Sequence, residues 1–209
     1  MTRLILVRHG ETEWNSDTVY RGRSEVPLSP RGRQQAECLG SRLAGEGVTL
    51  VHSSPLSRAL ETAHTIGRTA GLPVSVLPGL TDLDCGEWEG LSDEQVKKSY
   101  PELRRMWLSS PHLVRLPGGE SLDDVKQRVS LVLESALREN GTVVLVSHRV
   151  WHKVAICSLL GLDNSGFWQV RLDLAGMTVF DCSAGRRVLV KHNDTSHLSQ
   201  ACCPCVSDF

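Results

Sequence analysis

The chain has 209 residues, of which 40% are hydrophobic and 22% are charged, as expected for a globular protein with an apolar core. Its 23 basic and 24 acidic residues give a net charge of −1, which offers no general attraction to nucleic acid or to a membrane surface. No stretch of 18 apolar residues occurs, and the apolar run at residues 4–7 is too short for a signal peptide. We therefore predict a cytoplasmic protein that binds neither nucleic acid nor membrane.

Short apolar strands and amphipathic helices alternate up to residue 76. Strands are predicted at residues 3–7, 48–51 and 73–76. Ser29 and Pro30 open the first helix, and a second helix follows Pro55. This β-α-β-α-β order predicts a three-layer α/β/α sandwich, in which helices cover both faces of a mostly parallel central sheet.

The region between residues 79 and 119 is less regular. Ser92 and Gln95 indicate a capping box for a short helix that ends before Pro101. Ser121 and Asp124 cap a longer helix whose apolar residues recur at helical spacing. These apolar residues are Leu122, Val125, Val129, Val132 and Ala136.

The remaining chain completes one predicted domain, residues 1–200. A buried strand is predicted at residues 142–146, and a helix then runs to Gly161. Two or three closing strands are predicted around residues 169–174, 178–181 and 188–191. The last segment, residues 201–209, contains Cys202, Cys203 and Cys205. Three thiols so close together, without a matching pair elsewhere, make a poor tetrahedral metal site, so we expect a frayed tail.

Two of the predicted strands are followed by a histidine, which indicates a shared binding site. His9 follows the first strand and His148 follows the strand at residues 142–146. Because the carboxyl ends of parallel strands meet at one crevice, both imidazoles should face it. Arg8 lies beside His9, and Arg58 lies near the start of a helix whose N-terminus favours anions. Together these side chains would form a cationic cup for a tetrahedral dianion.

Several segments, in this order, resemble the motifs of the histidine phosphatase superfamily, the phosphoglycerate mutase-like enzymes. They are Leu6-Val7-Arg8-His9-Gly10-Glu11-Thr12-x-Trp14-Asn15, Pro27-Leu28-Ser29-x-x-Gly32-x-x-Gln35-Ala36, Ser53-Ser54-Pro55-Leu56-x-Arg58-Ala59-x-x-Thr62-Ala63, Leu80-x-Asp82, Gly86-x-Trp88-Glu89-Gly90, Gly119-Glu120-Ser121 and Val146-Ser147-His148. The likeness extends over nearly the whole chain and is greatest to the small phosphatases of the family.

The resemblance implies a role for each matching residue. His9 would attack phosphorus and become phosphorylated, while Arg8, Arg58 and His148 hold the non-bridging oxygens and Asn15 adds a donor. His148 would thus serve both catalysis and phosphate binding. No cofactor and no metal are implied, because the cationic side chains themselves supply the positive charge.

A carboxyl group must protonate the leaving oxygen and later accept a proton from water. Asp82, Asp84, Glu87 and Glu89 are close together in the sequence. The acid of the family falls at Asp82, although it is usually a glutamate, and Glu87 is the second choice. Trp88 and Glu89 are interpreted as packing and loop structure.

Arg21 and Arg149 depart from the family pattern, in which Gln and Gly are common at these positions. They either lie solvated or paired on the surface, or they contact a second anionic group of the substrate. His152 and Lys153 are interpreted as structural or solvated residues.

The sequence is thus interpreted as a metal-independent phosphatase of a small phosphomonoester, active as a monomer or a homodimer. A phosphoglycerate mutase is the alternative, followed by a catalytically idle phosphate-binding regulatory module. A metal-dependent hydrolase has less support, because His148 and His152 have suitable spacing but need not share a helix face. The substrate stays open, since the irregular region at residues 79–119 would select it.

Overall fold

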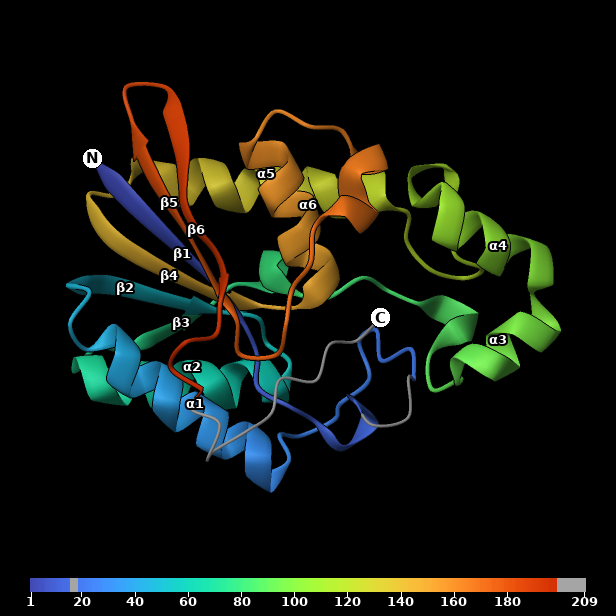
Figure 1. The fold of residues 1–209 in the computed structure, drawn as a ribbon, viewed down its shortest axis with the longest axis horizontal. Helices are drawn as coiled ribbons and strands as arrows, with labels where there is room; N and C mark the ends of the chain where they lie inside the picture. The colour runs from blue at the N-terminus through green and yellow to red at the C-terminus, as the bar shows by residue number, and fades with distance from the viewer. Residues whose placement is uncertain (16–18, 199–209) are drawn as a thin grey trace.

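The computed structural model describes residues 1–15 and 19–198, and one six-stranded sheet runs through these residues (Figure 1). The strands are β1 (Thr2–Arg8), β2 (Val48–Ser53), β3 (Val74–Val76), β4 (Gly141–Ser147), β5 (Met177–Ser183) and β6 (Arg186–Asp194). They lie in the order β3-β2-β4-β1-β5-β6. The first four in this order are parallel, whereas β5 is antiparallel to β1 and β6 is antiparallel to β5. The predicted α/β fold with a mostly parallel sheet is confirmed.

Helices cover both faces of the sheet. α1 (Pro30–Leu43) and α2 (Ser57–Ala70) lie on one face, and α5 (Leu122–Arg138) and α6 (Arg149–Leu159) lie on the other (Figure 1). Side chains of a strand alternate between the two faces. Leu4 and Leu6 of β1 therefore join the core under α5 and α6, whereas Ile5 and Val7 join the core over α1 and α2.

The predicted helix caps are present. Ser29 Oγ accepts a hydrogen bond from the backbone N–H of Gly32 over 3.0 Å at the start of α1. Ser121 and Asp124 form a reciprocal capping box at the start of α5. Such bonds satisfy amide groups that have no partner inside the helix.

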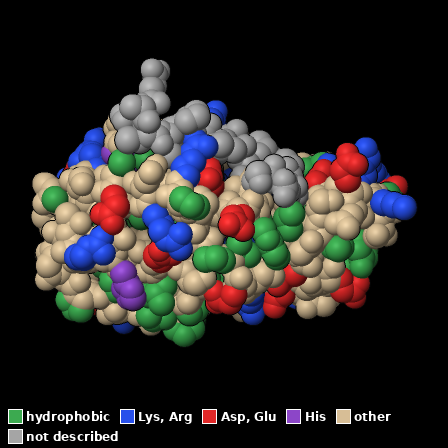
Figure 2. Space-filling view, turned by 90° about the horizontal axis from the view of Figure 1, so that it is seen from below, with side chains coloured by type: hydrophobic (Ala, Val, Ile, Leu, Met, Phe, Trp, Pro, Cys, Tyr) green, Lys and Arg blue, Asp and Glu red, His purple; other side chains and the backbone are tan. Residues whose placement is uncertain are grey.

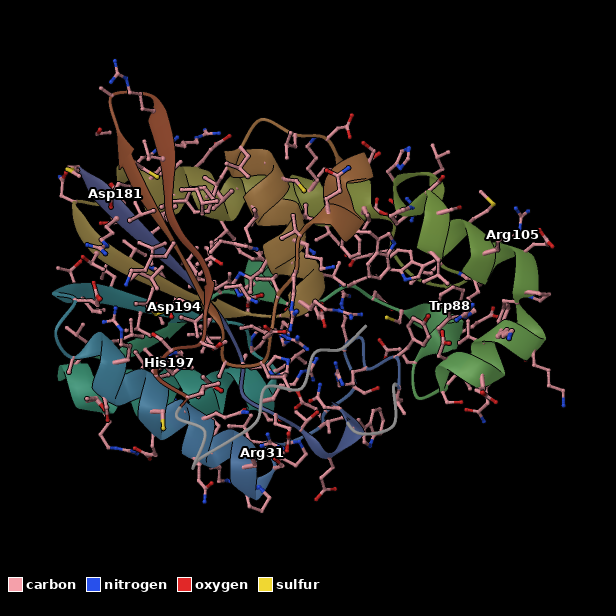
Figure 3. The ribbon with its side chains drawn as sticks, viewed as in Figure 1. Arg31, Trp88, Arg105, Asp181, Asp194 and His197 are labelled. Atoms are coloured by element: carbon pink, nitrogen blue, oxygen red, sulfur yellow. The ribbon has the colours of Figure 1, made fainter. Side chains whose placement is uncertain are left out.

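The region around Pro101 differs from the prediction. The capping box of Ser92 starts α3 (Asp93–Ser99) as expected, but a second helix, α4 (Pro101–Ser109), follows at once. Proline is compatible with the first turn of a helix, so Pro101 ends one helix and begins the next. α3 and α4 project from the sandwich at the right of Figure 1. Trp88, labelled in Figure 3, lies at the base of this projection, which we call the α3–α4 lobe.

The predicted strand around residues 169–174 is wrong. The 3-10 helix η5 (Asn164–Gln169) is followed by an irregular segment in which Val170, Leu172 and Leu174 are buried. Buried residues alternate here as they do in a strand, but backbone groups of this segment form hydrogen bonds with side chains and not with a neighbouring strand. The carbonyl of Leu172 accepts a hydrogen bond from the Arg8 guanidinium, and the N–H of Asp173 donates to Asn193 Oδ1.

Short 3-10 helices complete the described part of the chain. They are η1 (Glu13–Asn15), η2 (Pro78–Leu80), η3 (Gly86–Trp88) and η4 (Pro111–Leu113). The helices in the described residues are all too short or too polar to cross a membrane. On the face shown in Figure 2, acidic and basic side chains are interspersed, so this face carries no large patch of one charge. The expected frayed tail at residues 201–209 lies outside the described residues.

Candidate active site

His9 and His148 are brought together by the pairing of β1 with β4. These parallel strands are in register, with Arg8 opposite Ser147, and each histidine is the next residue along its strand. The N–H of His9 donates to the carbonyl of Ser147 over 3.1 Å. The two imidazole rings lie 5.2 Å apart between centroids, and both are buried. The two histidines thus lie side by side at the ends of neighbouring parallel strands, as predicted.

The loop after β1 can reach this position only because of two glycines. A Cβ atom added to Gly10 would lie 2.5 Å from the carbonyl oxygen of Gly32, and one added to Gly32 would lie 2.0 Å from the carbonyl oxygen of Glu11. The loop of His9 thus packs backbone against backbone on the first turn of α1.

His9 is held as a neutral base. Its Nδ1 donates to the carbonyl of Gly10 over 2.6 Å, since a carbonyl can only accept, and Nε2 therefore carries the lone pair. Burial lowers the pKa of His9 well below its ordinary value, and the charges of Arg58, Arg8 and Arg21 lower it further. An unprotonated Nε2 is what a nucleophile requires.

Two buried arginines flank the histidines. The Arg58 guanidinium donates to the carbonyls of Ser24 and Gly22, each over 2.8 Å, and is fully buried. Burial lowers the pKa of Arg58 to about 10, with the nearby carboxylate of Asp82 opposing this shift. Arg8 is also buried and donates from Nη1 to the carbonyl of Leu172 over 2.8 Å. Carbonyls orient these guanidinium groups without neutralising their charge.

Asp82 is the acidic side chain that lies beside the histidines. Its Oδ2 is 3.8 Å from Nη2 of Arg58 and 3.9 Å from Nδ1 of His148, and its Oδ1 accepts from the N–H of Leu83. Burial raises the pKa of Asp82 above its ordinary value, although Arg58 and the Leu83 N–H act in the opposite direction. The raised pKa favours the protonated carboxyl that a general acid needs.

The Ser54 hydroxyl contacts His148 and bears on where that ring carries its proton. The His148 Nε2 and the Ser54 hydroxyl oxygen are 2.7 Å apart, and this hydroxyl also accepts from the N–H of Leu56. If the buried hydroxyl donates to Nε2, the proton of His148 resides on Nδ1, which faces Asp82. Burial, followed by the charges of Arg58 and His9, lowers the pKa of His148 well below its ordinary value. The sequence analysis missed this role of Ser54, because a serine after a strand carries no signal of its own.

The other three acidic candidates have structural partners. Asp84 pairs with Arg23 over 3.2 Å, and Glu89 accepts from the N–H of Arg23 over 2.7 Å. Glu87 is exposed and accepts from the Tyr100 hydroxyl over 2.6 Å. Trp88 is fully buried, which agrees with its interpretation as packing.

The remaining predicted site residues lie at different depths. Asn15 is buried, and its Oδ1 accepts from the N–H and the hydroxyl of Thr12, each over 2.8 Å. Arg21 donates to the carbonyl of Trp14, and its charge acts on the pKa of both His9 and Asp82. Arg21 therefore acts electrostatically on both His9 and Asp82.

Arg149, His152 and Lys153 lie along α6. The Arg149 guanidinium carbon is 5.9 Å from the ring centroid of Trp168. His152 is buried and donates from Nε2 to the carbonyl of Val7, which agrees with a structural role. Lys153 is buried as well, so it is not a solvated residue.

Comparisons with known proteins show the family to which the chain belongs. The model of the histidine phosphatase superfamily, branch 1, matches residues 4–195. Phosphoserine phosphatase 1 of Hydrogenobacter thermophilus is 41% identical over 202 residues, with 96% of each chain covered. A probable phosphoglycerate mutase of Salmonella newport is 31% identical, with 95% of each chain covered. A phosphoserine phosphatase variant of Entamoeba histolytica, solved in complex with phosphoserine, superimposes with a TM-score of 0.85 at 33% identity, covering 95% of this chain and 100% of that one.

Proposed function

Since the chain belongs to branch 1 of the histidine phosphatase superfamily, we propose that His9 is the nucleophile of its phosphatase reaction. The protein is a phosphomonoester hydrolase. The observation that carries our assignment is the pair of neutral imidazoles, 5.2 Å apart, between two buried arginines and a carboxyl of raised pKa. This set can hold a phosphoryl group, attack it and protonate its leaving group.

In the first step, Nε2 of His9 attacks phosphorus, and the phosphorus–nitrogen bond forms as the ester bond breaks. Arg8, Arg58 and the Nδ1–H of His148 hold the non-bridging oxygens, and Asn15 adds a donor. Protonated Asp82 gives its proton to the leaving alkoxide. The products of this step are the free alcohol, phosphohistidine and the carboxylate of Asp82.

In the second step, water replaces the alcohol. The Asp82 carboxylate takes a proton from water as the water oxygen attacks phosphorus and the phosphorus–nitrogen bond breaks. Inorganic phosphate leaves, and both His9 and Asp82 return to their initial protonation states. No metal is needed in this scheme, because the arginines and imidazoles supply the positive charge around the phosphoryl group.

The substrate we propose is a small phosphomonoester, and O-phosphoserine is the first compound to test because two of the relatives are phosphoserine phosphatases. The similar probable phosphoglycerate mutase makes phosphoryl transfer the alternative. Release of inorganic phosphate from 3-phosphoglycerate, followed over time with and without 2,3-bisphosphoglycerate, separates the two reactions. The cytoplasmic location, the monomeric or homodimeric state and a contact of Arg21 with the substrate stay predictions.

Trapping the phosphorylated enzyme tests the mechanism directly. We expect label from a ³²P-phosphomonoester to appear on the peptide of His9 after a rapid quench, in an acid-labile and base-stable form, as in a phosphoramidate. His9→Ala should abolish both the label and turnover. His64→Ala, which removes an exposed histidine of α2, is the matched control and should retain both. Turnover in the folded His9→Ala protein would exclude the phosphohistidine route.

A further inference from the structure

Asp82, the proposed proton donor, lies in an irregular segment of the chain. This segment, residues 81–85, connects the 3-10 helices η2 and η3. Buried backbone groups outside helices and strands need other hydrogen-bond partners, and those partners fix the path of the chain. The place of the Asp82 carboxyl therefore depends on the side chains that bind this segment.

Arg128 of α5 binds three carbonyl groups in and before this segment. Its Nη2 donates to the carbonyl of Asp82 itself over 3.0 Å. Its Nη1 donates to the carbonyl of Thr81 and to that of Gly79, the latter over 3.2 Å. The donors of a guanidinium lie in one plane at fixed angles, so they orient the groups that they bind. Arg128 thus holds the peptide groups on both sides of the Asp82 Cα atom.

Glu120 holds the same segment two residues after Asp82. Its Oε2 accepts from the N–H of Asp84 over 3.0 Å and from Nη2 of Arg128 over 3.1 Å. The backbone N–H of Glu120 also donates to the carbonyl of Asp84 over 2.9 Å. One carboxylate therefore joins the guanidinium that binds Asp82 to the backbone that follows it.

The close approach of these two segments accounts for the motif Gly119-Glu120-Ser121, to which the sequence analysis assigned no role of its own. A Cβ atom added to Gly119 would lie 2.4 Å from the carbonyl oxygen of Asp84. Ser121 caps α5, and Arg128 lies about two turns further along that helix. Gly119 thus permits the contact, Glu120 makes it, and Ser121 starts the helix that carries Arg128.

We propose that Arg128 and Glu120 are positioning residues for the general acid, which act through Asp82 and hold its carboxyl at the leaving oxygen. This inference rests on the proposed function, since it takes Asp82 as the acid. The Oδ2 atom of Asp82 lies 3.8 Å from Nη2 of Arg58 and 3.9 Å from Nδ1 of His148. Because aspartate is short, a shift of its backbone moves the carboxyl with it. A displacement of about 1 Å in a catalytic group can cost about 100-fold in rate.

The test compares two leaving groups in single and double variants. Arg128→Met should slow the burst of the alkyl phosphate that the unaltered enzyme hydrolyses fastest by about 10-fold to 100-fold. It should affect p-nitrophenyl phosphate much less, because nitrophenolate leaves without a proton. Adding Arg128→Met to Asp82→Asn should slow the alkyl burst no further, since no acid is left to position. A residue that only supports the fold would slow both substrates and add its effect to that of Asp82→Asn.

Three further variants complete the set. Arg128→Lys should recover part of the alkyl burst, because an ammonium group can still donate to some of the carbonyls. Arg138→Met removes an exposed arginine of the same helix and should leave both bursts unchanged. If Arg128→Met does not fold, Glu120→Ala provides the test. It removes the acceptor of the Asp84 N–H and should give the same contrast between leaving groups.

The outcomes separate this inference from the proposed function. Equal effects on both bursts, no effect on either, or a further loss in the double variant would overturn the positioning role, while the contrast produced by Asp82→Asn alone would still support the acid. If Asp82→Asn shows no contrast between the leaving groups, the assignment of the acid fails and this inference with it. Label on His9 then reports separately whether the phosphohistidine route stands.

Discussion

At the scale of single residues, the site depends on where protons lie before the substrate arrives. His9 donates its Nδ1–H to the Gly10 carbonyl and leaves Nε2 unprotonated. His148 carries an N–H at Nδ1 if the Ser54 hydroxyl donates to its Nε2. Asp82 lies 3.9 Å from that nitrogen and has a raised pKa. In the proposed mechanism, one imidazole is the nucleophile, the other is a hydrogen-bond donor, and the carboxyl is the acid.

Asp82→Asn should slow the first chemical step by about 100-fold or more with alkyl phosphates, whose alkoxides leave poorly without a proton. The same change should affect p-nitrophenyl phosphate much less, because nitrophenolate leaves unaided. Quench-flow measurement of the initial burst isolates this step from the later hydrolysis of phosphohistidine. Glu87→Gln, which removes an exposed carboxylate bonded to Tyr100, is the control. Equal effects of Asp82→Asn on both bursts, or none, would reject the assignment.

Ser54→Ala should lower kcat/KM about tenfold, because His148 loses the bond that orients its proton. Ser54→Thr retains a hydroxyl and should recover part of the activity. Nitrogen-15 NMR of His148 reports the tautomer directly, and the proton should reside on Nδ1 in the unaltered protein. A proton on Nε2 in the unaltered protein would show that the hydroxyl accepts from the ring instead of donating to it.

At the scale of elements, the chemistry is set by where strands and helices end. β1 and β4 place the two histidines side by side, and the helix after β2 carries Arg58. The apolar runs predicted both strands to within a residue at each end, and the capping serines predicted the starts of α1, α3 and α5. The predictions were wrong where tertiary contacts override the local pattern. Pro101 begins α4, which packs on the aromatic core. After η5, the backbone groups of Leu172 and Asp173 form hydrogen bonds with side chains and not with a neighbouring strand.

Ser121→Ala should reduce the free energy of unfolding by about 1 kcal/mol, since it removes the capping box of α5. Ser130→Ala, on the same helix, removes a hydroxyl that only returns to the carbonyl of Lys126 and should change stability less. Urea unfolding followed by circular dichroism gives both values. Similar losses in the two variants would mean that the cap makes no special contribution.

At the scale of the whole molecule, the family, the phosphatase activity and the fold class were predicted from the sequence, and all three are confirmed. His9, Arg8, Arg58 and His148 could be grouped because each lies at the end of an easily recognised strand or helix. Ser54 could not, because its proposed role depends on burial and on a neighbour distant in the sequence. We propose that residues 1–200 form one domain, which the single sheet with its two covered faces supports.

The buried imidazoles also make the free energy of unfolding depend on pH. Burial lowers the pKa of His9, His148 and His152, the last to about 4. Because the folded-state pKa lies below the unfolded value, their contribution is complete above about pH 6.5 and is lost as the pH falls toward the folded value. For His152 alone the total is about 3 kcal/mol. Urea unfolding at pH 7.5, 6 and 5 should show decreasing stability, and a constant value would contradict buried neutral rings.

The aromatic contacts beneath the α3–α4 lobe have a consequence for how the enzyme can diversify. Trp88 meets Trp107 of α4, and Trp107 meets both Phe167 and Trp168, the rings that hold Lys153. His9 and His148, in contrast, are anchored to the sheet by β1 and β4. Changes in the lobe can therefore shift the rings of Phe167 and Trp168 while β1 and β4 keep the two histidines in place. Descendants of one ancestral enzyme could acquire new substrates through this lobe without rebuilding the reaction itself.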